Sequence, residues 1–373
     1  MSVTYRISYI EGDGIGPEIF TAARSVIEVL GECFKISFEF VPAPAGDRVL
    51  RETGEALPKS SYSIIRESDL CLKAPVGETA LQTIIFLRQQ LNLYANIRPA
   101  KNYQFIESKF QGVDLVIVRE NTEDLYVSRE FEENEGKKAI ALKVVTEEAS
   151  WRIARVAFET ALSRETNRNG KGRGPNVVCV HKSNVLPKSD GLFQRTCDSV
   201  AKNFPSVKYS SMYVDTAAMN LVKSPEAFDV IVTSNMYGDI LSDEASQVVG
   251  GLGLAASGNM GDDFAVFEPV HGCAPDIAGK GIGNPLSMLF TAKMMLDWLS
   301  SKRSDKSSAA ASKCLESSIS AVTGAGIKTP DIGGKSSTVE VARAICEEIR
   351  KQTGLGVDDG NMEAVKEDVV LRW

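Results

Sequence analysis

Short apolar runs alternate with longer amphipathic segments along most of this chain. Runs rich in β-branched and aromatic residues indicate strands at residues 6–10, 36–41, 70–73, 113–118, 177–180, 208–214 and 230–232. Apolar residues spaced three and four apart indicate helices at 19–30, 83–94, 147–162, 189–204, 216–222, 285–298 and 338–351, and one that opens near Gly238. Strands that alternate with helices predict an α/β architecture with a mostly parallel or mixed sheet.

Several stretches interrupt this alternation. Residues 128–145 form two strand-prone halves around the charged turn EENEGKK, which predicts a projecting hairpin that serves as an exchange arm between subunits. The others are an extended segment at 92–101, a solvated loop at 164–176, a long loop rich in Gly and Pro at 266–285, a solvated connector at 300–313 and a polar tail at 358–373. Long loops such as 266–285 are often functional.

The first strand runs into EGDGIGPEI, where Gly12, Gly14 and Gly16 stand two apart. A Rossmann fingerprint needs G-x-G-x-x-G and an acidic residue about twenty positions on. The spacing here differs, and Pro17 suits a first helical turn. A tight strand-to-helix turn is therefore at least as good an interpretation as a phosphate site.

Composition narrows the class of protein. The 373 residues suffice for one large or two medium domains, and a net charge of −7 gives no reason to expect binding to nucleic acid or to an anionic membrane. No apolar run approaches the length of a membrane span, and the acidic N-terminal segment does not resemble a signal peptide. Seven scattered cysteines without a C-x-x-C predict reduced thiols in a cytoplasmic protein.

Charged residues collect where the predicted strands end. Asp239 and Asp243 stand four apart, which places them on one face of the predicted helix. Two such acids repel each other unless a cation lies between them, although a helix N-terminus that favours negative charge is an equally good interpretation of the pair alone. Together with Asp215, they suit a hard ion such as Mg²⁺ or Mn²⁺.

Other residue types at the same strand ends suggest the ligand. Arg88, Arg98 and Arg119 suit bidentate binding of carboxylates. The chain has two histidines, His181 and His271, both in polar turns, so a histidine-ligated zinc site is not expected.

These residues lie in motifs that resemble those of the decarboxylating hydroxyacid dehydrogenases, which include isocitrate, 3-isopropylmalate and homoisocitrate dehydrogenases. The motifs follow the family's order over nearly the whole chain: EGDGIGPE (11–18), LR…LYANIRP (87–99), VRENTEDLY (118–126), HKSNVL…DGLF (181–193), VD (214–215), NMYGDILSDEA (235–245), GGLGLAASGN (250–259) and EPVHGCAPDIAGKGIGNP (268–285).

The resemblance implies the isopropylmalate dehydrogenase-like two-domain α/β fold, which is not a Rossmann fold. The larger, cofactor-binding domain would combine residues 1–99 with 254–373. The smaller domain, 100–253, would carry the dimer interface and the arm at 128–145. A homodimer with shared active sites, either alone or as half of a tetramer, is expected.

The resemblance also implies roles for individual residues. Arg88, Arg98 and Arg119 would bind the substrate's carboxylates, and Asp239 and Asp243 would hold the metal with Asp215 of the partner subunit, which also lies at the substrate. Lys182 would accept or relay the proton of the C2 hydroxyl and Tyr126 would protonate C3, both reaching across the dimer. The metal would polarise the new ketone.

The loop at 266–285 would bind NAD, through His271, Gly272, Ala274, Pro275, Asp276, Ile277 and Asn284. Asp276 falls where the family contacts the adenosine ribose. A carboxylate there accepts hydrogen bonds from ribose hydroxyls and repels a 2′-phosphate, whereas NADP-using relatives resemble a Lys-Tyr pair at Asp276 and Ile277. NAD is therefore the expected cofactor.

The substrate's variable group would be recognised just before Arg88. Isocitrate enzymes resemble S-x-N-x-x-L-R there, but this chain reads QTIIFLR, with Gln82 for the serine and Ile84 for the asparagine. Ile84 and Ile85 would form an apolar wall that leaves a third carboxylate unpaired and buries an isopropyl group, which favours 3-isopropylmalate. VRENTEDLY resembles the archaeal isopropylmalate branch, yet it is also close to isocitrate and homoisocitrate enzymes. Homoisocitrate, isocitrate and, more remotely, a non-catalytic regulatory subunit remain alternatives.

Overall fold

The structure, a computed structural model, describes residues 4–80, 82–103, 106–168 and 174–355. Its central element is a ten-stranded sheet in the order β2-β1-β3-β12-β11-β4-β5-β10-β8-β9. The strands of this sheet are β1 (Thr4–Ile10), β2 (Ser37–Pro42), β3 (Leu70–Lys73), β4 (Ala95–Lys101), β5 (Asp114–Glu120), β8 (Asn176–His181), β9 (Lys208–Tyr213), β10 (Val230–Thr233), β11 (Ala256–Met260) and β12 (Ala265–Pro269).

The sheet has two parallel wings joined by an antiparallel centre. Strands β2, β1, β3 and β12 run parallel to one another, as do β5, β10, β8 and β9. Between the wings, β11 pairs antiparallel with β12 and β4, and β4 pairs antiparallel with β5. The predicted α/β class with a mixed sheet is thus confirmed.

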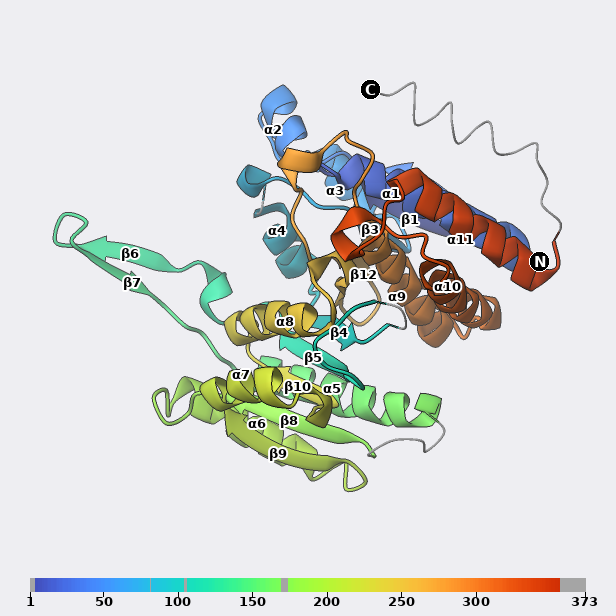
Figure 1. Ribbon diagram of the computed structural model, residues 1–373. Helices are drawn as coiled ribbons and strands as arrows, with labels where there is room; N and C mark the ends of the chain where they lie inside the picture. Colours follow the sequence, from blue (N-terminus) through green and yellow to red (C-terminus); the bar gives the residue numbers. More distant parts are fainter. Residues whose placement is uncertain (1–3, 81, 104–105, 169–173, 356–373) are drawn as a thin grey trace.

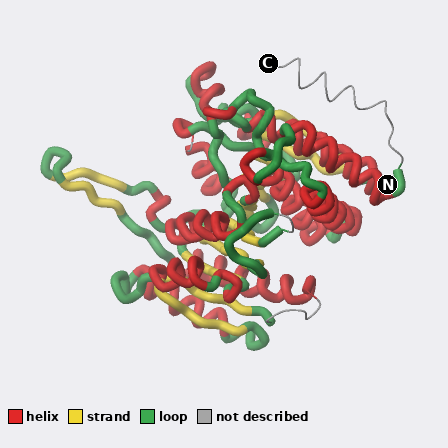
Figure 2. The backbone as a smooth tube through the Cα atoms, viewed as in Figure 1, coloured by secondary structure: helices red, strands yellow, loops and turns green. Residues whose placement is uncertain are grey.

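Helices cover both faces of the sheet (Figures 1 and 2). They are α1 (Gly16–Phe34), α2 (Asp47–Thr53), α3 (Lys59–Arg66), α4 (Gln82–Gln90), α5 (Glu147–Arg168), α6 (Ser189–Ala201), α7 (Val214–Lys223), α8 (Asn235–Val249), α9 (Leu286–Arg303), α10 (Lys306–Gly324) and α11 (Thr338–Thr353). Among the described helices, none combines the length and apolar character that a bilayer span needs.

A two-stranded ribbon projects from the body, as Figure 1 shows. It consists of β6 (Glu130–Glu133) and β7 (Lys138–Ala141), which pair antiparallel around a turn with three residues of positive φ, Asn134, Glu135 and Gly136. The hairpin predicted at 128–145 is therefore confirmed, and its exchange with another subunit stays a prediction.

Buried side chains form separate clusters in the two wings. In the first wing, one cluster packs α1, α9, α10 and α11 on the sheet, and another lies on the side of α4. In the second wing, β5, β8 and β10 alternate between a face covered by α5 and α6 and a face covered by α7 and α8. The boundaries predicted at residues 99/100 and 253/254 remain a prediction. The cores do not divide at 99/100, because Ile106 belongs to the first wing and Tyr94 and Ala95 belong to the second.

Some sequence-based expectations were wrong in detail. The stretch 300–313 is not a solvated connector, because α9 continues to Arg303 and α10 begins at Lys306, capped by the Asp305 carboxylate. Its serines and charged residues are typical of a loop, yet Ser308, Ala311 and Ser312 are buried, and small side chains let α10 pack closely on α9. The loop predicted at 266–285 begins as β12, and β11 was not predicted. Residues 169–173 of the predicted loop 164–176, and the tail 358–373, lie outside the described residues.

Candidate active site

A polar face runs across four neighbouring strands at the centre of the sheet. Register partners in a sheet point to the same face, and so do residues two apart. Asn96 and Arg98 of β4 therefore share a face with Arg119, the partner of Asn96 on β5. Asn259 of β11 is the other partner of Asn96, and Ser257 pairs with Glu268 of β12. Strand register thus gathers side chains from residues far apart in the sequence.

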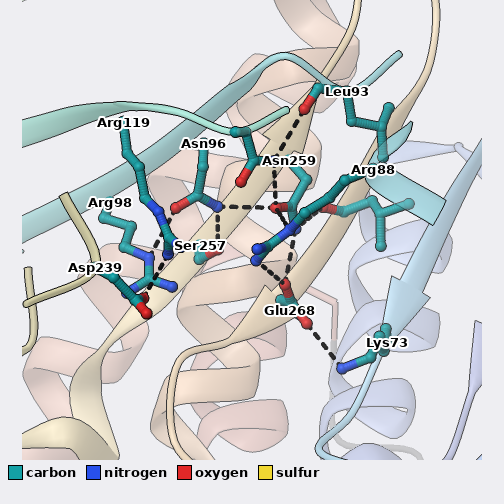
Figure 3. Close-up of polar contacts among 12 residues, drawn as sticks. Lys73, Arg88, Leu93, Asn96, Arg98, Arg119, Asp239, Ser257, Asn259 and Glu268 are labelled. Atoms are coloured by element: carbon teal, nitrogen blue, oxygen red, sulfur yellow. Dashed lines mark hydrogen bonds and ion pairs between the residues drawn. The ribbon is translucent and has the colours of Figure 1, made fainter. Parts of the chain in front are cut away.

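Asn259 and Glu268 connect this face to Arg88 of α4 (Figure 3). The Asn259 Oδ1 accepts hydrogen bonds from Arg88 Nε at 2.9 Å and from the amides of Asn96 and Asn121 at 3.0 Å. Glu268 forms ion pairs with Lys73 at 2.8 Å and with Arg88 at 3.4 Å. Burial raises the pKa of Glu268, but Lys73 and Arg88 outweigh it and lower the value to about 2. The carboxylate therefore stays charged.

Two of the three predicted arginines, Arg98 and Arg119, contact the predicted aspartates of α8. All three guanidinium groups are buried, and burial lowers the pKa of Arg88 to about 10 and also lowers that of Arg98. Arg119 forms an ion pair with Asp239. Arg98 Nη1 lies 3.2 Å from Asp239 and 3.3 Å from Asp243, so a guanidinium cation lies between the two acids.

The two aspartates differ in their surroundings. For Asp239, Arg119 and Arg98 outweigh the effect of burial and lower the pKa, whereas burial dominates at Asp243 and raises its pKa. The Asp243 side chain is also 53% exposed, against 36% for Asp239. The site is therefore open to solvent beside Asp243 and closed behind the arginines.

Gly238 allows α8 to approach β5 closely. A Cβ at this position would lie 2.6 Å from Arg119 Cγ, which is closer than real side chains come. The glycine therefore allows Asp239, the next residue, to contact Arg119.

Tyr126 joins the same cluster from the 3₁₀ turn Leu125–Val127. Its hydroxyl donates a hydrogen bond of 2.5 Å to Asp239 Oδ2, and Arg119 Cζ lies 5.0 Å from the ring centroid. Burial raises the pKa of Tyr126, so the phenol keeps its proton at neutral pH. The expectation that Tyr126 reaches across a dimer was wrong, because its hydroxyl is hydrogen-bonded to Asp239 of its own chain.

Lys182 and Asp215 form a separate pair. Lys182 follows β8, Asp215 lies in the first turn of α7, and the two side chains are joined by an ion pair. Within the described part of the chain, neither forms a hydrogen bond or ion pair with the arginine cluster, and no three His, Cys, Asp or Glu side chains gather as a metal site would require. The predicted triad of Asp215, Asp239 and Asp243 is thus not assembled within one chain.

The predicted cofactor residues lie in the loop after β12. Ala274 has a left-handed φ of 42° and precedes the 3₁₀ turn Pro275–Ile277, which exposes Asp276. His271 Nδ1 lies 2.9 Å from the Gly272 carbonyl, and burial lowers the His271 pKa. At the far end of the loop, Asn284 donates to Asp331 at 2.8 Å.

The glycines of EGDGIGPE pack on this loop. Ile15 N donates to the Cys273 carbonyl at 2.8 Å, and a Cβ on Gly14 would lie 1.9 Å from that oxygen. Asp13 accepts hydrogen bonds from the backbone of Asp47, Arg48 and Gly77. The motif forms a tight turn that ties several loops together, and the G-x-G-x-G spacing reflects these close approaches.

The two isoleucines before Arg88 have different surroundings. Ile84 is 8% exposed and belongs to the core cluster on the α4 side. Ile85 is half-buried and lies outside the described core clusters. Of the predicted pair, Ile85 is therefore the side chain with free surface for a ligand.

Four members of this site were not predicted from the sequence: Lys73, Asn96, Asn259 and Glu268. Lys73, Asn259 and Glu268 lie in the short strands LCLK, ASGNM and AVFEP, and Asn96 lies in the segment ANIRPAK, which was predicted only as extended. In these strands, only the alternation of polar and apolar residues indicated a polar face. In ASGNM, Ser257 and Asn259 are the polar residues two apart, which is typical of a strand with one polar face.

Comparison with known proteins identifies the family. Residues 6–349 match the isocitrate/isopropylmalate dehydrogenase family. A 3-isopropylmalate dehydrogenase from Sulfurisphaera tokodaii is 47% identical over 91% of this chain and 98% of its own. A homoisocitrate dehydrogenase from Methanocaldococcus jannaschii is 42% identical over 93% of this chain and 98% of its own. Isocitrate dehydrogenase from Methylococcus capsulatus has a similar crystal structure, with a TM-score of 0.84 and 38% identity over 93% of this chain and 99% of that chain. The resemblance drawn from the motifs is confirmed: the chain belongs to the isocitrate/isopropylmalate dehydrogenase family and is a decarboxylating dehydrogenase.

Proposed function

We propose that this protein catalyses the NAD-dependent oxidative decarboxylation of 3-isopropylmalate in leucine biosynthesis. The observation that carries the proposal is the polar cluster in which Arg98 and Arg119 pair with Asp239. Arg88 joins the same cluster through Asn259 and lies on the helix that presents Ile85. The name of the 47% identical relative supports the choice of substrate.

The arginines would bind the two carboxylates of a malate-type acid. Their guanidinium groups are buried, and each donates a hydrogen bond to an asparagine side chain. The pairs are Arg88 with Asn259, Arg98 with Asn96 and Arg119 with Asn235. Binding a dianion would therefore cost little conformational entropy of the arginine side chains, because the donors are already in place. Bidentate pairs of this kind also orient the substrate.

The chemistry of the donor set fits a divalent metal. Asp239 and Asp243 offer hard oxygen donors at the open side of the cluster, and Asp215 of the partner subunit would add a third. A Mg²⁺ or Mn²⁺ held there would supply Lewis-acid polarisation of the C2 oxygen and stabilise negative charge on it. That Arg98 already lies between Asp239 and Asp243 supports this reading, because the position attracts a cation.

Two side chains would move the protons. Lys182, paired with Asp215, would accept the proton of the C2 hydroxyl as NAD accepts the hydride. Tyr126, protonated at neutral pH because burial raises its pKa, would donate a proton to C3 after carbon dioxide has left. The cofactor would lie on the loop that carries His271 and Asp276, with the Asp276 carboxylate toward the ribose hydroxyls.

The dimer is part of this proposal. Exposed apolar side chains lie on the α7–α8 pair, where Met219 is 60%, Val222 53% and Ile240 62% exposed. An apolar face of this kind supports a homodimer, either alone or as half of a tetramer. The seven free thiols agree with a reducing, cytoplasmic location.

Homoisocitrate is the second candidate, because the 42% identical relative bears that name and VRENTEDLY is close to that branch. Steady-state kcat/KM values with 3-isopropylmalate, homoisocitrate, isocitrate and D-malate, each with NAD and Mn²⁺, test the choice. We expect 3-isopropylmalate to be the best substrate. If isocitrate is best, the argument from an apolar wall is wrong.

A further inference from the structure

A lysine outside the predicted site lies partly buried at the start of α8. Lys143 follows β7, where the chain returns from the projecting ribbon to the body (Figure 1). Its side chain is 13% exposed, and its Nζ lies 2.8 Å from Asp190 and 3.4 Å from Asp124. Both carboxylates are 1% exposed. Nζ also lies 3.4 Å from the Ser234 hydroxyl and 4.2 Å from the Tyr237 ring centroid.

The two carboxylates hold the turns that carry Tyr126 and Lys182. Asp124 caps the 3₁₀ turn of Tyr126 by accepting from Leu125 N at 2.9 Å, and it accepts from Met236 N of α8 at 3.0 Å. Asp190, in the first turn of α6, accepts from the backbone N of Lys182 at 2.7 Å. Lys143 therefore joins two turns whose side chains do not contact each other.

The backbone before Tyr126 needs such support. Asp124 has φ 68°, which L-residues rarely adopt, so the turn persists only because its surroundings hold it. Asp124 N donates to the Val144 carbonyl at 2.8 Å, so the segment after β7 holds this residue through the backbone as well as through Lys143.

The lysine is itself stable there only because of the two acids. A cation is disfavoured at a helix N-terminus, and Lys143 lies at the N-terminus of α8. Burial lowers the pKa of Lys143, but Asp124 and Asp190 outweigh it and raise the value. The three charges thus form one unit.

We propose that Lys143 is a positioning residue, which clamps Asp124 and Asp190 and so sets the places of Tyr126 and Lys182 for proton transfer. This rests on the proposed function, because Tyr126 and Lys182 must be the groups that move protons. The lysine does not contact the arginines, so it should affect turnover and leave substrate affinity nearly unchanged. Misplacing a catalytic group by about 1 Å can cost roughly 100-fold in rate.

The test compares Lys143→Met and Lys143→Arg with a matched control, Lys293→Met. Lys293 is also partly buried, at 22% exposure, between two acids, Asp297 at 2.9 Å and Glu316 at 3.5 Å, but it lies on α9. We expect Lys143→Met to lower kcat roughly 100-fold with KM for the hydroxy acid within about threefold. Lys143→Arg should keep at least about a tenth of the wild-type kcat, because a guanidinium can still bridge two carboxylates. Lys293→Met should lose thermal stability and keep kcat.

The outcomes separate the inference from the proposed function. If Lys143→Met loses stability but keeps kcat, as Lys293→Met should, the positioning role is wrong. If Lys143→Met does not fold, Asp190→Asn replaces it, and an unchanged kcat in that variant would equally overturn the role. Tyr126→Phe and Lys182→Met test the proposed function by themselves: if both keep the wild-type kcat, their assigned roles fail, whatever Lys143 does.

Discussion

At the scale of single residues, the buried charges of the site are stable only because each has a neighbour of opposite charge. Glu268 is buried between Lys73 and Arg88, and removing one member of such a group leaves the others uncompensated. Arg98 likewise lies between two acids. A neutral substitution in this network should therefore lower the free energy of unfolding by more than the loss of one contact would.

Glu268→Gln tests this with a dependence on pH. The pKa of Glu268 is lowered from 4.5 to about 2, so its charge stabilises the fold above about pH 4.5, and this contribution is lost as pH falls toward 2. The shift corresponds to roughly 3 kcal/mol. We expect the variant to be less stable than the wild type by about 3 kcal/mol at pH 7, and the difference to shrink between pH 5 and pH 3, as measured by urea unfolding.

Glu67→Gln is the control, because Glu67 meets Arg6 at 3.9 Å on the surface and should contribute less than about 1 kcal/mol. A Glu268→Gln difference that stays constant as the pH falls would contradict the account.

Asp276 tests the choice of cofactor. Its side chain is exposed on the turn Pro275–Ile277, so Asp276→Lys should fold normally. A lysine would attract the 2′-phosphate that an aspartate repels, and we expect the ratio of kcat/KM for NAD over NADP to fall at least tenfold. Asp276→Asn, which removes the charge without reversing it, should give an intermediate ratio. An unchanged ratio in both variants would refute the assignment.

At the scale of elements, the two isoleucines of α4 that were predicted to select the substrate have different surroundings. Ile84 packs in the core, while Ile85 keeps free surface. The exchange suggested by the isocitrate motif, Gln82→Ser with Ile84→Asn, should raise the use of isocitrate but also cost roughly 2–5 kcal/mol of stability.

Ile85→Asn should separate the two effects. We expect it to raise kcat/KM for isocitrate relative to 3-isopropylmalate at least tenfold, with little change in melting temperature, because an amide can pair with the third carboxylate. If Ile84→Asn alone shifts the preference and Ile85→Asn does not, the buried isoleucine is the selector.

Some helices and strands can be predicted from the sequence alone, and others cannot. Strands β5, β8 and β10 are continuous apolar runs and were predicted. The first half of helix α10 is mostly Ser, Ala and Lys, and its apolar residues at helical spacing follow only from Ala311 on. Strand β11 is ASGNM, which depends on packing that the local pattern does not contain. The arginines and aspartates were found through motifs, whereas Asn259 and Glu268 join them only through strand register.

At the scale of the whole molecule, the site residues fall into two groups. Arg88, Arg98, Arg119, Tyr126, Asp239 and Asp243 form one, and Lys182 with Asp215 forms the other. If two subunits share active sites, each site takes one group from each chain. A chain by itself would then lack a complete site.

Mixing two inactive variants tests this arrangement. Asp239→Asn and Lys182→Met should each be inactive as homodimers. In a mixed dimer, one site carries both substitutions and the other carries neither. Random assembly gives half mixed dimers, each with one intact site of two, so the mixture should regain about a quarter of the wild-type activity.

The control mixes Asp239→Asn with Asp243→Asn, both from the first group. Every site in that mixture carries one substitution, whichever way the chains pair, so it should stay inactive. Equal amounts of each pair are unfolded together, refolded and assayed with NAD and Mn²⁺. If the first mixture also stays inactive while both variants dimerise, Lys182 and Asp239 act within one chain, and the two groups must come together by a movement of the chain itself.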